Sequence, residues 1–151
     1  MLRMSKLTDY GTVIMTYMAR QPQGVHSVAE MAAVLGLAAP TTSKILKILA
    51  RRELVHSLRG VKGGYRLARP PEQISIAEVI DAMEGPFGMT ECSVVAGLCV
   101  QEAGCPLREN WQRLNQVIRR ALDGVTLAEM SRPSFRPAAQ GAARPAVPRR
   151  S

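Results

Sequence analysis

The feature that most constrains the fold is a helix-start signal at the head of three segments. In each, a Ser or Thr is followed three residues later by Glu. The pairs are Ser27 and Glu30, Ser75 and Glu78, and Thr126 and Glu129. Such a hydroxyl and carboxylate satisfy unpaired backbone amides of the first helical turn, forming a capping box. The pattern therefore predicts helices that begin near residues 27, 75 and 126.

The apolar pattern supplies the other elements. Apolar residues at helical spacing predict helices over 7–20, 27–35, 40–52, 75–83 and 107–122. Two short strand-like runs within residues 54–68 flank Gly60, Gly63 and Gly64, which predicts a β-hairpin. Aromatic residues make up only 4% of the 151 residues, so an aliphatic core of packed helices is favoured over a large sheet.

Three helices followed by a hairpin is the element order of a winged helix-turn-helix. The fold class we predict is mainly α, with this unit followed by a long C-terminal helix. The helix at 40–52 has short polar groups near its start for base edges, and Lys and Arg further along for phosphates. Together with the hairpin tip, the candidate DNA-binding residues are Thr41, Thr42, Ser43, Lys44, Lys47, Arg51, Arg59, Lys62, Gly63, Tyr65 and Arg66.

The distribution of charge agrees with a polyanionic partner. Between Pro40 and Pro70 there are eight Lys or Arg and one acid, within a chain of net charge +8. A concentrated basic stretch of this kind is typical of nucleic-acid binding, although a solvated basic surface explains it equally well. No apolar stretch approaches the roughly 20 residues of a membrane span, so we expect a cytoplasmic protein with reduced thiols.

The three cysteines lie in a segment without helical or strand periodicity, residues 85–105. Their spacing, Cys92-x6-Cys99-x5-Cys105, is neither a zinc ribbon nor a Cys-Cys-His-His finger. Three thiolates supply three of the usual four ligands of an iron–sulfur cluster. A zinc site and a thiol switch are the alternatives. No general base accompanies the cysteines, so we do not expect an enzyme.

The helix at 107–122 carries a narrow apolar seam. Its members alternate at spacings of four and three, which is typical of a coiled coil. We expect this seam to form a homodimer interface, and the alternative is packing on the chain's own core. The interface residues we predict are Trp111, Leu114, Ile118 and Ala121. Residues 131–151, which are rich in Pro, Ala and Arg, are expected to be a disordered tail.

Four blocks of sequence together resemble one family. They are MLRMSKLTDYGTVIMTYMA, SVAEMAAVLGL, and LVHSLRGVKGGYRLA followed by ISIAEVIDAMEG; three cysteines then precede a helix containing WQRL. This combination, over residues 1–130, resembles the Rrf2 family of winged-helix regulators, which includes IscR-like and NsrR-like transcription factors. The N-terminal block is most similar to the subgroup that regulates the SUF iron–sulfur assembly operon.

The resemblance implies a homodimer that binds a pseudo-palindromic promoter site in double-stranded DNA. Cys92, Cys99 and Cys105 match the cluster cysteines, and Arg59 matches the arginine that enters the minor groove. A two-iron two-sulfur cluster is favoured and a four-iron four-sulfur cluster is the alternative. Two positions depart from the IscR-like pattern. Ser43 stands where those members carry a glutamate. Arg108 stands where they carry a histidine ligand, and arginine does not bind iron.

NsrR-like members use an aspartate of the partner subunit as a ligand, and the matching residue here is Asp9.

For the organisation of the chain, we expect residues 1–84 to form the DNA-binding domain and 85–106 the cysteine-bearing cluster loop. Residues 107–130 would hold the dimerisation helix and a short C-terminal helix. The expected function is repression of SUF-type genes by an iron–sulfur regulator. The alternatives are a regulator of other stress genes that senses redox state or nitric oxide, and a zinc-stabilised DNA-binding module.

Overall fold

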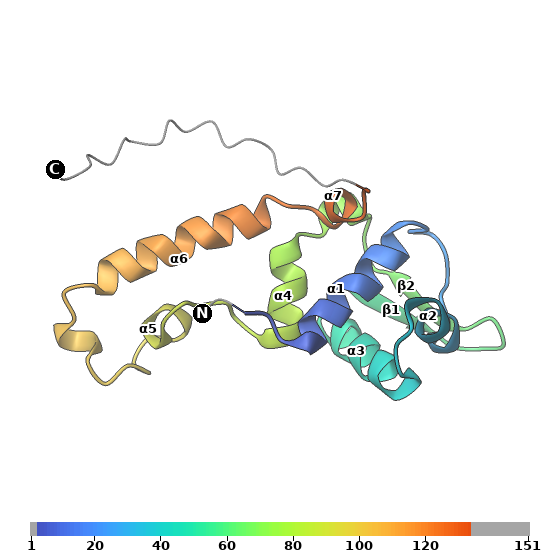
Figure 1. Cartoon of the computed structure of the whole chain (residues 1–151), viewed down its shortest axis with the longest axis horizontal. Helices are drawn as coiled ribbons and strands as arrows, with labels where there is room; N and C mark the ends of the chain where they lie inside the picture. The colour runs from blue at the N-terminus through green and yellow to red at the C-terminus, as the bar shows by residue number, and fades with distance from the viewer. Residues whose placement is uncertain (1–2, 134–151) are drawn as a thin grey trace, which may run out of the picture.

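A computed structural model of the chain describes residues 3–133. The predicted tail at 131–151 therefore lies outside the described residues, apart from its first three. Along the chain, a mainly helical body with a hairpin comes first, and a long projecting helix follows it (Figure 1). They are α1 (Lys6–Ala19), α2 (Val28–Leu35), α3 (Ala39–Arg51), β1 (Val55–Leu58), β2 (Gly64–Leu67), η1 (Pro71–Gln73), α4 (Ile76–Glu84), α5 (Glu91–Val94), η2 (Glu102–Gly104), α6 (Arg108–Asp123) and α7 (Leu127–Met130).

Each helix predicted from the sequence is present within a residue or two of its expected bounds. Local capping explains this agreement. Ser75 with Glu78 and Thr126 with Glu129 form complete capping boxes. The Ser27 hydroxyl accepts a hydrogen bond from the Glu30 amide. The Glu30 carboxylate, however, accepts from the Tyr17 hydroxyl at 2.8 Å, so this residue joins α2 to α1.

The core is aliphatic and rich in methionine, as the composition predicts. It lies between α1, α3 and α4, and the short η1 and α7 close it from the C-terminal side. Its fully buried members include Ile14, Met15 and Met18 of α1; Ile45, Leu46 and Leu49 of α3; Val79 of α4; and Leu127 of α7. Within residues 3–133, no single helix is long and apolar enough to cross a membrane.

The two strands form the predicted hairpin. They pair antiparallel, with Val55 opposite Leu67 and Leu58 opposite Gly64. A third extended segment joins them at one point, where His26 and Tyr65 exchange backbone hydrogen bonds of 2.8 Å. The hairpin root is therefore held by the body of the molecule, while its tip projects from it (Figure 1).

The long helix α6 projects from the opposite end of the molecule (Figure 1). None of its residues is buried. Arg119 joins it to α4 through a 2.5 Å ion pair with Asp81, and the same guanidinium donates to Asp123 at 3.2 Å. These two carboxylates raise the pKa of Arg119, Asp81 contributing most. After the C-terminal end of α6, the short helix α7 packs against α1 and η1 in the body of the molecule.

Candidate DNA-binding surface and cysteine loop

One exposed face of α3 forms a shallow hollow. Its volume is about 530 Å³, and it is lined by Pro40, Ser43, Lys44, Lys47, Ile48 and Arg51. These positions recur every three or four residues, so they share one side of the helix. Three of the six side chains are cationic, and none of those three has an ion-pair partner within residues 3–133. This face is therefore basic and open to a polyanion.

The structure corrects two expectations about α3. Thr42, predicted to contact DNA, is fully buried, and its hydroxyl donates to the Ala38 carbonyl at 3.1 Å. It lies on the core side because one residue turns the helix by about 100° from its neighbour. Apolar spacing alone would place Ile48 with Ile45 and Leu49 on the core side of this helix, but Ile48 is half-buried and lines the basic hollow, while Leu46 occupies the core. Thr41 is half-buried and does not line the hollow.

The hairpin tip is a tight turn that carries two exposed cations, Arg59 and Lys62. The Gly63 amide donates to the Gly60 carbonyl at 2.9 Å. A Cβ at Gly63 would lie 2.5 Å from the Leu58 carbonyl oxygen, so only glycine fits this turn. The requirement for Gly63 is therefore structural, and its contact with DNA stays a prediction.

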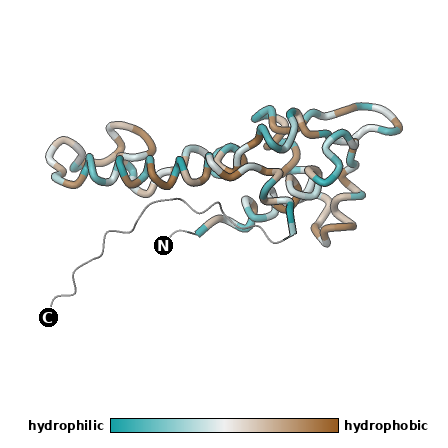
Figure 2. Tube along the Cα trace, turned by 90° about the horizontal axis from the view of Figure 1, so that it is seen from above, coloured by the Kyte–Doolittle hydropathy of each residue, from teal (hydrophilic) through white to brown (hydrophobic). Residues whose placement is uncertain are grey.

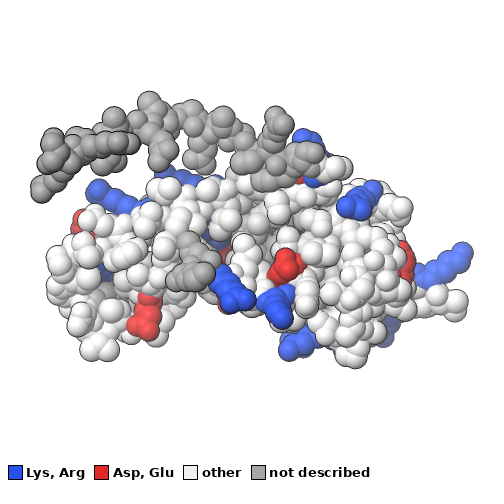
Figure 3. Space-filling view, in the orientation of Figure 1, with Lys and Arg blue, Asp and Glu red and all other residues white. Residues whose placement is uncertain are grey.

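The other two predicted wing residues lie on the second strand. Tyr65 is half-buried and packs against the core. Arg66 lies opposite His56 in the strand register. Figure 3 shows Lys and Arg at the end of the molecule where the hairpin projects, with few acidic side chains around them.

The three cysteines lie on the segment that connects α4 to α6, and all three are half-buried free thiols. Cys92 is in α5, and its Sγ is 3.1 Å from the Thr90 hydroxyl. Cys99 follows α5, and Cys105 follows η2. The Met89 amide donates to the side chain of Asn115 at 3.3 Å, which ties this segment to α6. The expected aperiodic loop is thus broken by two short helical turns.

An iron–sulfur cluster is the group that three thiolates on one segment imply. The donor chemistry fits, because soft thiolates are the usual ligands of such clusters. Within residues 3–133, however, no three His, Cys, Asp or Glu side chains lie close enough together to hold a metal ion. The cysteines therefore supply the right atoms without converging on one point. Asp9 lies exposed in the first turn of α1.

A polar link joins the beginning of α1 to the end of α4. The Glu84 carboxylate accepts a 2.7 Å hydrogen bond from the Ser5 amide and another of 2.7 Å from the Thr8 hydroxyl. These two donors hold the pKa of Glu84 below its usual range. Glu84 is the last residue of α4, so the cysteine segment starts where α1 is capped. The sequence offered no signal for this contact beyond a Ser and Thr spaced to cap a helix.

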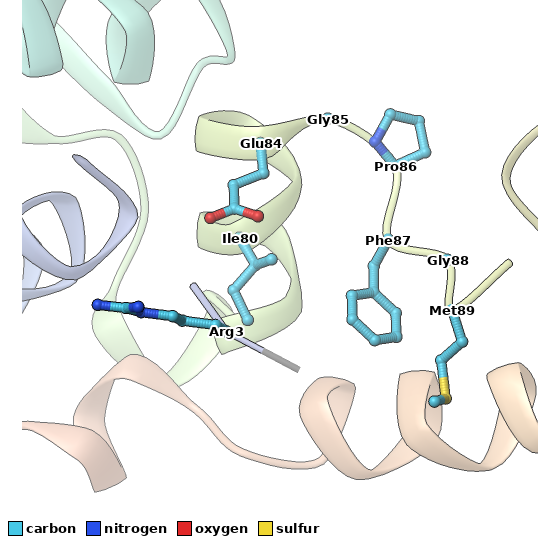
Figure 4. Close-up of a pocket in the computed structure, with 8 residues that line it drawn as sticks. All are labelled: Arg3, Ile80, Glu84, Gly85, Pro86, Phe87, Gly88 and Met89. Atoms are coloured by element: carbon cyan, nitrogen blue, oxygen red, sulfur yellow. The ribbon is translucent and has the colours of Figure 1, made fainter. Parts of the chain in front are cut away.

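A cavity of about 300 Å³ lies at the root of the cysteine segment (Figure 4). It is lined by Arg3, Ile80, Glu84, Gly85, Pro86, Phe87, Gly88 and Met89. A neighbouring cavity of about 200 Å³ shares Ile80 and Phe87 and adds Ile118 and Leu122 of α6. Apolar side chains of α4, the cysteine segment and α6 thus meet around partly empty space. Figure 2 shows apolar and polar positions alternating along α6.

A helix-turn-helix with a basic face, followed by a basic hairpin, defines a winged-helix DNA-binding protein. The sequence matches the Rrf2 family, described as iron-dependent transcriptional regulator, over residues 4–133. The chain belongs to the Rrf2 family of transcriptional regulators. Proteins of this family bind DNA and are not enzymes.

Solved structures support this assignment. CymR of B. subtilis, described as the global cysteine regulator, is 29% identical with a TM-score of 0.68, covering 87% of this chain and 97% of that chain. IscR of T. potens is 30% identical with a TM-score of 0.63, covering 85% of each chain. CymR of S. aureus is 28% identical with a TM-score of 0.64, covering 86% of this chain and 98% of that chain.

Proposed function

We propose that this regulator represses SUF-type iron–sulfur assembly genes and that an iron–sulfur cluster sets its affinity for DNA. The observation that carries the proposal is the set of three half-buried thiols on the single segment between α4 and α6. The match to a family described as iron-dependent supports it. In this proposal the chain acts in the cytoplasm, where its thiols stay reduced.

The DNA-binding surface in this proposal combines α3 and the hairpin. Lys44, Lys47 and Arg51 contact phosphates from the exposed face of α3, and Ser43 presents a hydroxyl to base edges. Arg59 enters the minor groove from the hairpin, where a narrow groove concentrates negative potential. Two copies of this surface would read the halves of a pseudo-palindromic site.

A second copy of the chain covers α6 in this proposal. Leu114 and Val117 are 42% and 58% exposed, although each lies on a helix with a marked apolar side. The apolar cavity around Phe87, Ile118 and Leu122 lies at the base of this helix. A two-fold pair of α6 helices would bury both features at once, because the same patch serves both partners.

Asp9 of the partner subunit completes the cluster in this proposal. Arg108 cannot act as a ligand because its guanidinium stays protonated. His26 is buried between Tyr17 and Gln21, and His56 lies on the hairpin, so neither histidine is near the cysteine segment. A carboxylate is a harder ligand than a thiolate, which would make its bond to iron the labile one.

A thiol-based sensor is the second candidate. Within residues 3–133 the three thiols are not gathered into a metal-holding group, and the Thr90 hydroxyl is already next to the Cys92 sulfur. A regulator that responds to oxidation of these thiols would need no cluster.

The spectrum of anaerobically purified protein separates these candidates. We expect visible absorption bands, iron and acid-labile sulfide, and a change in affinity for a SUF promoter when the cluster is removed. A colourless protein with zinc would indicate a structural site. A colourless, metal-free protein whose DNA affinity changes on thiol oxidation would indicate the thiol sensor.

A further inference from the structure

The apex of the hairpin carries an apolar side chain that the fold does not use. Val61 is fully exposed, at 108% of its reference exposure. Lys62 follows it and Arg59 lies two residues before it. A β-branched apolar group therefore stands between two cations at the projecting tip of a DNA-binding protein.

The backbone holds this side chain in a fixed position. Val61 and Lys62 are the central residues of a turn closed by the 2.9 Å hydrogen bond from Gly63 to Gly60. The close approach of Gly63 to the Leu58 carbonyl keeps the turn tight. Below it, the strand pairing and the bridge between His26 and Tyr65 anchor the hairpin. The apex is thus pre-organised, so contact there costs little conformational entropy.

An exposed valine is by itself ordinary on a protein surface. Its position makes the difference here. Neither Arg59 nor Lys62 has an ion-pair partner in the part of the chain that the structure describes. A tip that only touched phosphates would gain from a polar group between these cations. The valine side chain cannot hydrogen-bond to phosphate or to a base edge. It therefore contributes to the binding free energy only where apolar surface of the partner removes it from water.

We propose that Val61 packs against the deoxyribose walls of the DNA minor groove. Minor-groove binders frequently place apolar side chains inside the groove as wedges between base steps, so an apolar group at a groove-entering tip has a physical precedent. Arg59 and Lys62 on either side would neutralise the flanking phosphates, which brings the sugars close enough to cover the valine. This inference rests on the proposed entry of the hairpin into the groove and adds to it an apolar contribution that salt does not screen.

The first test uses a duplex selected by the full chain from a random-sequence pool. Val61→Thr keeps the shape and adds a hydroxyl, and it leaves the fold unchanged because the side chain is fully exposed. We expect affinity to fall by roughly three- to tenfold, with no change in the slope of log affinity against log salt concentration. Lys62→Met should instead reduce that slope by about 0.9, as loss of one phosphate contact does.

The matched control is Val13→Thr, at a 38% exposed position on α1, which should bind DNA as the wild type does. Wild-type affinity in Val61→Thr would overturn the proposal. A loss that comes with a smaller salt slope would also overturn it, because the contact would then be electrostatic. If the wild-type chain selects no duplex at all, the proposed DNA surface fails together with this inference.

The second test locates the contact. Guanine carries an amino group that projects into the minor groove, and inosine lacks it. We expect single inosine substitutions beneath the hairpin to tighten wild-type binding, and to tighten Val61→Thr binding less. Equal gains in the two proteins would show that the side chain does not lie in the groove.

Discussion

Neighbouring residues of α3 show how a single position decides the role of a side chain. Ser43 and Lys44 line the basic hollow on α3. The residue before them, Thr42, is fully buried, and its hydroxyl donates a hydrogen bond to a backbone carbonyl at the start of the same helix. Residue type alone made Thr42 a candidate for base contact. The phase of the helix, fixed by the burial of Ile45 and Leu46, excludes it.

At this scale, substitutions separate positioning contacts from groove reading. Lys47→Ala should weaken binding to all duplexes and lower the salt dependence, because it removes a phosphate contact.

Arg59→Ala should cost more on the selected site than on random DNA, of the order of 1–3 kcal/mol, if it reads the groove. Fluorescence anisotropy on both duplexes measures the two effects. Equal losses on both for Arg59→Ala would refute its groove-reading role.

At the scale of elements, the sequence predicted the helix starts and the hairpin, because these features depend on residues that are close together along the chain. Capping pairs three residues apart, such as Ser75 with Glu78, placed the helix starts, and the glycines placed the hairpin. The hydrogen bond between Ser5 and Glu84 joins residues 79 apart. It depends on how α1 packs against α4, which no local pattern encodes. The cysteine spacing likewise did not predict that, within residues 3–133, the three thiols are not gathered into a metal-holding group.

The link between α1 and α4 should depend on pH. Its donors lower the pKa of Glu84 from the ordinary 4.5, so the carboxylate is bound more tightly when charged. The stabilisation is therefore complete above about pH 4.5 and is lost as the pH falls through the lower, folded-state pKa. Because Glu84 is exposed and water screens its charge, Glu84→Gln should cost only about 0.5 kcal/mol at neutral pH, and this difference should shrink on acidification.

Urea unfolding at a series of pH values measures this difference. Glu72→Gln, at an exposed position of η1, is the control and should follow the wild type. A difference between Glu84→Gln and the wild type that stayed constant down to acid pH would show that the charge of Glu84 has no part in the link.

At the scale of the whole molecule, α6 projects with an apolar side that the single chain leaves exposed. Leu114→Lys should convert the proposed dimer to a monomer, because a charge cannot be buried between two apolar seams without a partner. It should also weaken binding to a two-half-site duplex far more than to a single half-site. Sedimentation velocity gives the mass. Gln116→Lys, at an exposed position of the same helix, should remain dimeric.

The proposed ligand Asp9 makes a prediction that only two subunits together can test. If each cluster takes its cysteines from one chain and Asp9 from the other, neither an Asp9→Ala homodimer nor a Cys92→Ser homodimer can assemble the native cluster. A heterodimer of the two variants, isolated with two different affinity tags, retains one complete set. The cysteines come from the Asp9→Ala chain and the aspartate comes from the Cys92→Ser chain.

We expect this heterodimer to show the wild-type visible and electron-paramagnetic spectra at half the wild-type iron content. A native spectrum in the Asp9→Ala homodimer would exclude Asp9 as a ligand. Loss of the native spectrum in the heterodimer would show that Asp9 acts within its own chain, because the chain that holds the three cysteines would then lack its aspartate.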